Sequence, residues 1–330
     1  MSSGAYRWIP EPPGRIVRRE ELLNVPEFEP MAERRLDPAT FAAIAGGDRS
    51  AFQRITLRQR LLVDTTGLDL TLELFGSKMF APILVGPAGQ QQRFHPEGEI
   101  ATARGAAAAK AAMVVSDRSS QPIEKVVAAA GEATFWYQVF PGGDIAAARE
   151  RAKAAVEAGC RVVCITLGAP AADAGGDPVQ GVSWESIDRL REGLGVPILL
   201  KGVMSAEEAR TAVDRGIQGI VVSNYGGHLV PGTVHPVSVL ASVAEAVGGR
   251  AAILVDGGFR RGSDVLKALA LGAQAVLVSR PVLWGLAAYG AEGVQNVIEM
   301  LQTELARYMA MVGLVDLKAI TPAAIRIHRR

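Results

Sequence analysis

From about residue 80 onward, short apolar runs rich in β-branched residues alternate with glycine-rich or polar breaks and with amphipathic or alanine-rich segments. Eight runs are predicted to be strands, over residues 81–89, 113–118, 134–140, 161–168, 197–203, 219–227, 251–259 and 275–281. Helices are predicted between them over 97–111, 144–158, 205–215, 236–247 and 263–271, with a further amphipathic helix over 294–313. Eight strands that alternate with helices over 80–313 predict an α/β fold, a (β/α)8 TIM barrel, which usually takes ~250 residues.

The alternative, a doubly wound sheet, is disfavoured. No G-x-G-x-x-G follows a predicted strand, and no G-x-x-x-x-G-K-[ST] occurs in the chain. We therefore expect a TIM barrel with an N-terminal helical arm and C-terminal helices. The proline-rich residues 1–35 are predicted to be an extended N-terminal arm on a surface or a neighbouring subunit, because proline fixes φ and lacks a backbone donor. Residues 36–330 are predicted to form a single barrel domain.

Composition narrows the functional classes. The chain has 330 residues with 35 Lys and Arg against 34 Asp and Glu, a net charge of +1, so it has no strong field to attract nucleic acid or an acidic membrane. No run approaches ~20 apolar residues, which predicts neither a signal peptide nor a membrane span. Two cysteines, Cys160 and Cys164, fit neither a disulfide framework nor a zinc site, so we expect a reducing, cytoplasmic environment and no metal.

A TIM barrel carries its active site at the C-terminal ends of its strands. Those ends are polar here, and they supply Gly89, Ser116, Gln138, Thr166, Lys201, Ser223, Asp256 and Arg280. Any one of these side chains could merely satisfy a loop, but Lys201 and Asp256 follow apolar runs, where a charge is costly unless it is paired or bound to a ligand. Asp117 and Arg118, directly after Ser116, could also face a substrate.

The loops after the last two predicted strands predict a phosphate site. VDGGFRRG supplies glycine amides and two arginines, and VSRP supplies a third arginine at a helix start. The alternative is a glycine turn with solvated Arg260 and Arg261.

Three segments then indicate a family. KGVMSAEEARTAVDRGIQGIVVSNYGGH, VDGGFRRGSDVLKALALGAQAVLVSRP and HPEGEIATARGAAAA resemble the FMN-dependent L-2-hydroxy-acid oxidase/dehydrogenase family, which includes glycolate oxidase, lactate oxidase and mandelate dehydrogenase. The resemblance runs from about Leu36 to Ala323. It implies an FMN-dependent oxidoreductase that acts on CH–OH groups by hydride transfer to flavin N5. It also implies a homo-oligomer, since members of the family are commonly tetramers.

The resemblance assigns flavin contacts residue by residue. Lys201 matches the lysine beside the N1/C2 edge, Gln138 and Thr166 match the residues that bind the pyrimidine ring, and Ser116 and Ser223 match serines near the flavin. The segment past N5 corresponds to Pro87, Ala88 and Gly89, and the phosphate and ribityl contacts correspond to Asp256, Gly257, Gly258, Arg260, Ser279 and Arg280. A dianionic phosphate favours arginines and amides, and a flavin that accepts hydride favours a fixed positive charge.

The substrate side departs from the family. Where the family has SNHGxRQ this chain has SNYGGHL, so Tyr225 replaces the catalytic histidine and His228 replaces an arginine that pairs with the substrate carboxylate. Family tyrosines become Phe140 and Ala43, the aspartate of T-x-D becomes Gly168, and PAADAGG offers no second arginine. An ordinary phenol titrates near ~10 and an imidazole near ~6.5, so the basicity lost is about 5 kcal/mol.

We therefore expect poor turnover of lactate and glycolate. The candidate catalytic residues are Lys201 with Tyr225, as an acid or hydrogen-bond donor, or His228, as a displaced base. His228 could equally be a solvated loop residue.

A further departure is a short connection after the fourth strand. Only residues 171–183 lie between it and the WESIDRL helix, where the family has a much longer lid. An open flavin face predicts a bulkier substrate or a partner that completes the pocket, unless the deletion has no consequence. Three functions stay open: an FMN oxidoreductase with a noncanonical substrate, a non-redox FMN barrel enzyme resembling isopentenyl diphosphate isomerase, and a catalytically degenerate homologue that keeps FMN or only the barrel.

Overall fold

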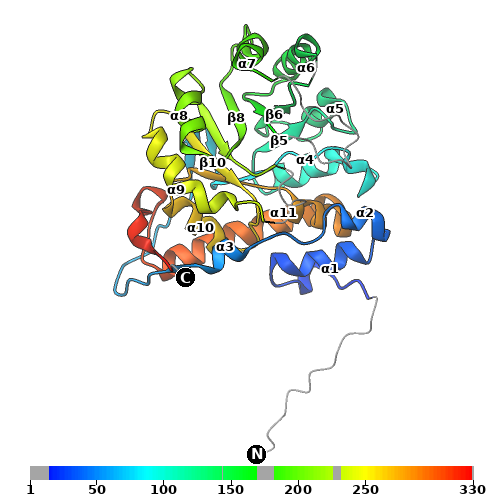
Figure 1. Cartoon of the computed structure of the whole chain (residues 1–330). Helices are drawn as coiled ribbons and strands as arrows, with labels where there is room; N and C mark the ends of the chain where they lie inside the picture. The colour runs from blue at the N-terminus through cyan, green and yellow to red at the C-terminus, as the bar shows by residue number, and fades with distance from the viewer. Residues whose placement is uncertain (1–14, 143, 169–181, 226–231, 329–330) are drawn as a thin grey trace, which may run out of the picture.

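The computed structural model describes residues 15–142, 144–168, 182–225 and 232–328. Its centre is a closed barrel of eight parallel strands in the order β10-β11-β4-β5-β6-β7-β8-β9, which confirms the predicted TIM barrel (Figure 1). The strands are β4 (Ile83–Val85), β5 (Met113–Ser116), β6 (Phe135–Val139), β7 (Val163–Thr166), β8 (Ile198–Val203), β9 (Gly219–Val222), β10 (Ala252–Asp256) and β11 (Ala275–Val278). Each is shorter than its predicted run, because the glycine-rich or polar ends of the runs leave the hydrogen-bonded ladder.

The helices that follow these strands form the outer layer. They are α4 (Glu99–Ala108), α5 (Ile123–Ala128), α6 (Ile145–Glu157), α7 (Trp184–Arg191), α8 (Ala206–Asp214), α9 (Pro236–Val247), α10 (Gly262–Ala270) and α11 (Arg280–Met311). Side chains cap several of their N-termini, as where Asp144 accepts from the Ala147 amide and Ser205 from the Glu208 amide. Helix α11 is kinked at Tyr289 and Gly290, whose φ of 61° a glycine adopts without strain.

Side chains alternate between the barrel interior and the helical layer along each strand. One interior layer is apolar and fully buried, and it consists of Leu84, Val114, Trp136, Cys164, Leu199, Val221, Leu254 and Leu277. A hairpin of β2 (Leu72–Leu74) and β3 (Ser77–Met79) adds Leu74 and Met79 to the same cluster, and Phe75 packs edge-on against Trp136. The hairpin plugs the N-terminal end of the barrel, so polar chemistry is confined to the C-terminal end.

The predicted extended arm is wrong for the part of it that the structure describes. Residues 15–35 contain the short helices η1 (Arg19–Glu21), η2 (Val25–Glu27) and α1 (Phe28–Glu33), which pack on α11 (Figure 1). Proline did not prevent them, because Pro26 lies in the first turn of η2, where its missing donor is not needed. Burial of Val25 and Phe28 fixes the arm, and Phe28 meets the Tyr289 ring edge-on.

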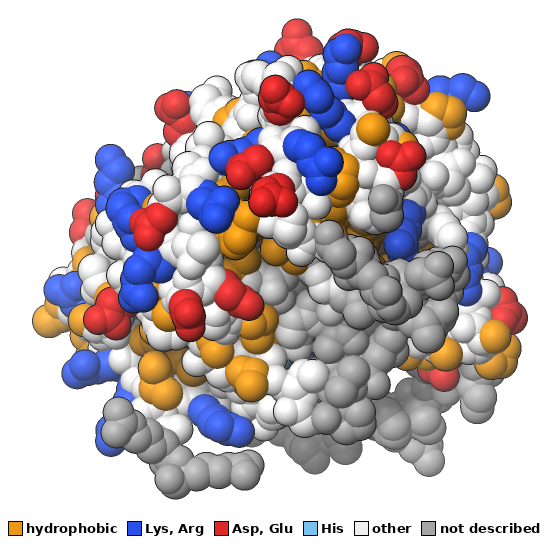
Figure 2. All heavy atoms as spheres, turned by 45° about the horizontal axis from the view of Figure 1, so that its top comes forward, with side chains coloured by type: hydrophobic (Ala, Val, Ile, Leu, Met, Phe, Trp, Pro, Cys, Tyr) orange, Lys and Arg blue, Asp and Glu red, His pale blue; other side chains and the backbone are white. Residues whose placement is uncertain are grey.

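The remaining N- and C-terminal segments complete the outside of the barrel. Helices α2 (Pro38–Ala42) and α3 (Ser50–Gln53) flank a loop that crosses the start of α11, while β1 (Ile55–Leu57) pairs antiparallel with β12 (Ile325–Ile327). Short helices η3 (Gln91–Arg93), η6 (Leu317–Ala319) and η7 (Pro322–Ala324) lie in connections. In the part of the chain that the structure describes, no helix combines the length and apolarity needed to cross a bilayer. Figure 2 shows basic and acidic side chains interspersed over one face.

Candidate active site

Directly above the apolar interior layer, toward the C-terminal end of the barrel, the inward-facing positions become polar. We call this set the polar layer, and it consists of Ser116, Gln138, Thr166, Lys201, Ser223, Asp256 and Ser279. Each member lies two residues beyond a member of the apolar layer on the same strand, so strand alternation brings them to one level. Every one of these residues was among the candidates drawn from the sequence.

Lys201 lies at the centre of this layer. Its ammonium group is 2.8 Å from Oδ2 of Asp256 and donates a hydrogen bond to Oγ of Ser223 over 2.9 Å. The Lys201 side chain is 4% exposed and that of Asp256 is 17% exposed. Breaking such a buried pair by removing one partner costs about 3–5 kcal/mol, so a buried cation is held in place inside the barrel.

Two members of the polar layer have buried polar atoms without a partner. The Ser116 hydroxyl donates to Oε1 of Gln138 over 2.7 Å, which leaves the amide nitrogen of Gln138 unbonded. The hydroxyl of Thr166 is likewise buried and unbonded. An unmet buried donor costs about 1–3 kcal/mol, so these two groups, on neighbouring strands, indicate a ligand with hydrogen-bonding edges.

Two arginines converge beside the polar layer at the start of α11. Nη2 of Arg260 donates to the carbonyl of Gly46 over 2.9 Å, and Nη1 of Arg280 donates to the same carbonyl over 3.1 Å. The Arg260 guanidinium also lies over the Trp284 ring, 4.4 Å from its centroid. Among the described residues neither arginine has a carboxylate within ion-pair distance, and burial lowers the pKa of both guanidinium groups. An anion at the start of α11 would pair with both guanidinium groups. The N-terminus of α11 also favours a negative charge there.

The other arginine of the glycine-rich loop points elsewhere. Arg261 pairs with Glu304 at 2.9 Å, and the amides of Arg260 and Arg261 donate to the buried Asp264 carboxylate, which caps α10. The alternative of two solvated arginines is therefore wrong for Arg260, which is buried, while the side chain of Arg261 is 37% exposed and pairs with Glu304 away from the start of α11. Gly257 and Gly258 have φ of 95° and 78°, and a Cβ on Gly258 would come within 2.7 Å of the Asp48 carbonyl. Only glycine fits there.

A second set of residues lies just past the strand ends, and we call it the rim layer: Ala88, Arg118, Phe140, Gly168 and Tyr225. The Arg118 guanidinium lies over the Phe140 ring at 4.3 Å, the Phe140 and Tyr225 rings are 5.4 Å apart, and the Lys201 ammonium lies 5.0 Å from the Tyr225 ring centroid. Two aromatic rings thus lie between two cations.

The phenol of Tyr225 in the rim layer holds its proton more tightly than a histidine at this position would. Burial raises the pKa of the Tyr225 phenol above its usual ~10, although the nearby positive charges of Arg118 and Lys201 oppose the rise. Tyr225 is therefore a neutral hydrogen-bond donor at physiological pH. Burial also raises the pKa of Asp117, whose carboxylate accepts from the Phe140 amide over 3.0 Å.

The segment Pro87, Ala88 and Gly89 follows β4 and reaches the rim layer. The Gln90 amide donates to the Arg118 carbonyl over 2.9 Å, and a Cβ on Gly89 would lie 2.7 Å from that carbonyl. The Ala88 carbonyl accepts from the Gln91 side chain. The structure therefore brings this predicted segment against Arg118.

Some predicted positions are not part of this arrangement. His228 and most of the short connection over 171–183 lie outside the described residues. Ala43 is exposed on the loop after α2. Cys164 belongs to the apolar interior layer, where burial raises its pKa to about 12, as expected of a packing residue.

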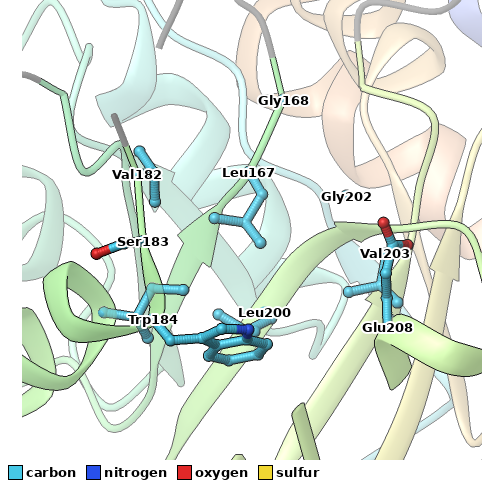
Figure 3. A pocket seen from close by; sticks show the side chains of 10 residues that line it. Leu167, Gly168, Val182, Ser183, Trp184, Leu200, Gly202, Val203 and Glu208 are labelled. Atoms are coloured by element: carbon cyan, nitrogen blue, oxygen red, sulfur yellow. The ribbon is translucent and has the colours of Figure 1, made fainter. Parts of the chain in front are cut away.

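A separate cavity of about 530 Å³ lies outside the barrel, between β7, β8 and α7. Figure 3 shows Leu167, Trp184 and Leu200 around it, with Glu208 of α8 on the far side. Leu200 and Lys201 are neighbours on β8 and point to opposite faces of the sheet. The cavity therefore belongs to the helical layer and not to the barrel mouth.

Two residues near the site, Arg118 and His235, had only weak signals in the sequence. Arg118 lies two residues after Ser116, and this spacing alone could have placed it on the same inward face. His235 received no role, yet it is buried at the start of α9, where Nδ1 accepts from the Val237 amide and Nε2 has no partner. A histidine directly before the proline of a predicted helix start was its only signal.

Known proteins resemble the chain along most of its length. The family model described as FMN-dependent dehydrogenase matches residues 42–175 and 175–327. A peroxisomal (S)-2-hydroxyacid oxidase of Arabidopsis thaliana is 35% identical, with 93% of this chain and 97% of the relative covered. A 4-hydroxymandelate oxidase of Amycolatopsis orientalis is 34% identical over 88% of this chain and 94% of the relative. A crystal structure of mandelate oxidase with (S)-2-phenylpropionate superposes with a TM-score of 0.87 at 33% identity, covering 94% of this chain and 100% of that one.

Proposed function

The chain belongs to the FMN-dependent dehydrogenase family, and from that membership we propose that it oxidises 2-hydroxy acids larger than glycolate or lactate. The protein is an FMN-dependent oxidoreductase of the 2-hydroxy-acid oxidase type. What is proposed beyond this is the size of the substrate and the residues that act on it.

The observation that carries the assignment of the flavin site is the pair of unbonded buried groups beside a buried cation in the polar layer. The Gln138 amide nitrogen and the Thr166 hydroxyl are free to bond the edge of a flat heterocycle, and Lys201 offers positive charge at the same level. The two arginines at the start of α11 suit a phosphate. These residues fit FMN, and we propose that they hold it, with Ser116, Ser223, Asp256, Gly257, Gly258, Ser279 and the segment 87–89 around it.

Bound FMN supplies a hydride acceptor. The chain supplies charge and proton handling. Lys201, held in place by its 2.8 Å ion pair with Asp256, stabilises negative charge that develops beside it. Tyr225, held neutral by burial, donates a hydrogen bond to the substrate oxygen, and it cannot take the hydroxyl proton while it keeps its own. We propose His228, the other candidate from the sequence, as the base, because an imidazole ordinarily titrates near ~6.5.

Two observations support a larger substrate. The family match is in two parts that meet at residue 175, inside the connection that the sequence analysis identified as shortened. The structural neighbours are named for mandelate and one matched relative for 4-hydroxymandelate, which carry aromatic rings, while other matched relatives are named for lactate and glycolate. Because the matched relatives carry the names of oxidases, the isomerase-like and degenerate alternatives are not favoured.

We further propose a cytoplasmic homo-oligomer, with a tetramer as the expected state. Leu61 and Leu62 project into solvent with 81% and 106% exposure on the loop after β1, which supports an intersubunit contact. Size-exclusion chromatography with light scattering tests this, and a monomer at micromolar concentration would contradict it. Since several matched relatives are named as peroxisomal, the compartment itself needs a localisation experiment.

The first test of the proposed function is the absorption spectrum of the purified protein, with the chromophore released by denaturation and identified. We expect one FMN per chain. A colourless protein that also fails to take up added FMN would overturn the assignment of the polar layer.

A further inference from the structure

Arg118 lies at the opening of the barrel, in the turn that follows β5. Its guanidinium covers one face of the Phe140 ring at 4.3 Å, and its charge acts on Tyr225. The backbone carbonyl of Arg118 lies against Gly89, in the segment that is assigned to the flavin. Arg118 therefore lies between the proposed flavin position and the aromatic pair of the rim layer.

Among the described residues, Arg118 has no carboxylate within ion-pair distance. Its Nη1 is buried and donates no hydrogen bond. The adjacent Asp117 forms no ion pair with it, because that carboxylate is 3.4 Å from Nη2 of Arg151 and accepts a hydrogen bond from the Phe140 amide. Lys201, by contrast, is neutralised by Asp256 at 2.8 Å.

A buried, unbonded guanidinium edge is costly unless a ligand meets it. Stacking on Phe140 fixes the plane of the group and leaves its edge free, which suits a planar anion that can accept two parallel hydrogen bonds. A carboxylate is such an anion.

We propose that Arg118 binds the carboxylate of the 2-hydroxy-acid substrate, with Phe140 positioning its guanidinium. Arg118 thus supplies a charge that this chain lacks at position 228, where the family motif has arginine and this chain has histidine. The substrate class is narrowed to free acids, so the matching esters and amides bind poorly. This inference rests on the proposed function.

The test uses the FMN-loaded protein and three 2-oxo acids of rising size: pyruvate, 4-methyl-2-oxopentanoate and benzoylformate. Their binding is followed by the change in the flavin spectrum, so it needs no turnover. We expect Arg118→Met to weaken binding of the tightest acid about 10- to 100-fold. Arg118→Lys should recover part of the loss, and binding of the matching methyl esters should not change.

Arg104→Met is the matched control, because it removes an arginine that pairs with Glu97 and touches neither Arg118 nor Asp117. It should leave acid binding and FMN content as in the native protein. Unchanged acid binding in Arg118→Met with full FMN content would overturn the proposal, as would a native protein that binds no acid more tightly than its ester. Failure of the proposed function looks different, since then no 2-hydroxy acid bleaches the flavin even where the 2-oxo acids bind through Arg118.

Discussion

The polar layer and the rim layer are separated by only two residues along each strand, yet they differ in how they are held. Gln138 and Thr166 lie at or near strand ends and inside the barrel hydrogen bonding, so strand register fixes their position. Arg118 and Tyr225 lie past the strand ends, where loops hold them. A residue past a strand end can be exchanged without disturbing the barrel. The difference explains how one chain can keep a cofactor site and carry a different substrate site.

The largest expected effect comes from the centre of the polar layer. Lys201→Met should lower kcat about 1,000-fold, the scale seen when one preorganised charge or donor is removed from a reaction centre. Steady-state kinetics with a 2-hydroxy acid measures this. Lys201→Arg keeps the charge and should retain more activity, and equal losses in the two variants would argue that charge at this point is unimportant.

Removal of one phosphate-side arginine should act on cofactor affinity. Arg280→Ala should raise the FMN dissociation constant about 100-fold, because it removes a charge-assisted contact. Fluorescence titration of the apoprotein with FMN gives the constant. Arg261→Ala is the control, since Arg261 pairs with Glu304, and a similar loss in that variant would contradict the division of roles within the loop.

The rim layer should respond more weakly and through a different quantity. Tyr225→Phe should lower kcat about tenfold, the value of one hydrogen bond, with FMN content unchanged. Because burial raises the pKa of Tyr225, the phenol stays protonated as the pH rises to 10, so kcat of the native protein should not climb between pH 8 and 10. A steady rise over that range, absent from Tyr225→Phe, would instead make Tyr225 the base.

The smallest effect concerns stability near the phosphate loop. Burial lowers the pKa of His235, so as the pH falls through ~6.5 the unfolded chain binds a proton before the folded protein does. The stabilisation is complete above ~6.5 and declines below it. Thermal melts between pH 7.5 and 5.5 measure the decline. His235→Asn keeps a capping side chain that does not titrate, and its melting temperature should fall less over this range; equal slopes would exclude His235 as the cause.

Much of the fold followed from the chain alone. Each barrel strand lies inside a predicted run, since a parallel strand covered on both faces reads as a continuous apolar run. The polar layer was predictable because each member follows such a run. A helical N-terminal arm was expected, but its packing was not, because the burial of Val25 and Phe28 depends on α11, far away in the sequence.

The details of the site depended on distant partners as well. Arg260 and Arg261 are adjacent in the sequence, and only contacts with Gly46 and Glu304 separate their directions. The sequence does not predict that Arg118 has no ion-pair partner, because the adjacent Asp117 could have paired with it. In the structure Asp117 pairs with Arg151 instead. The spacing of residues along a strand therefore predicts the height of a side chain along the barrel axis, and tertiary packing determines which groups it contacts.

We propose that this chain combines a retained flavin site with an altered substrate site. Anaerobic bleaching of the bound FMN tests it most directly, with glycolate, L-lactate, (S)-2-hydroxy-4-methylpentanoate and (S)-mandelate compared at equal concentration in a stopped-flow instrument. We expect at least one of the two larger acids to reduce the flavin at least tenfold faster than glycolate or lactate. Fastest reduction by glycolate or lactate would contradict it.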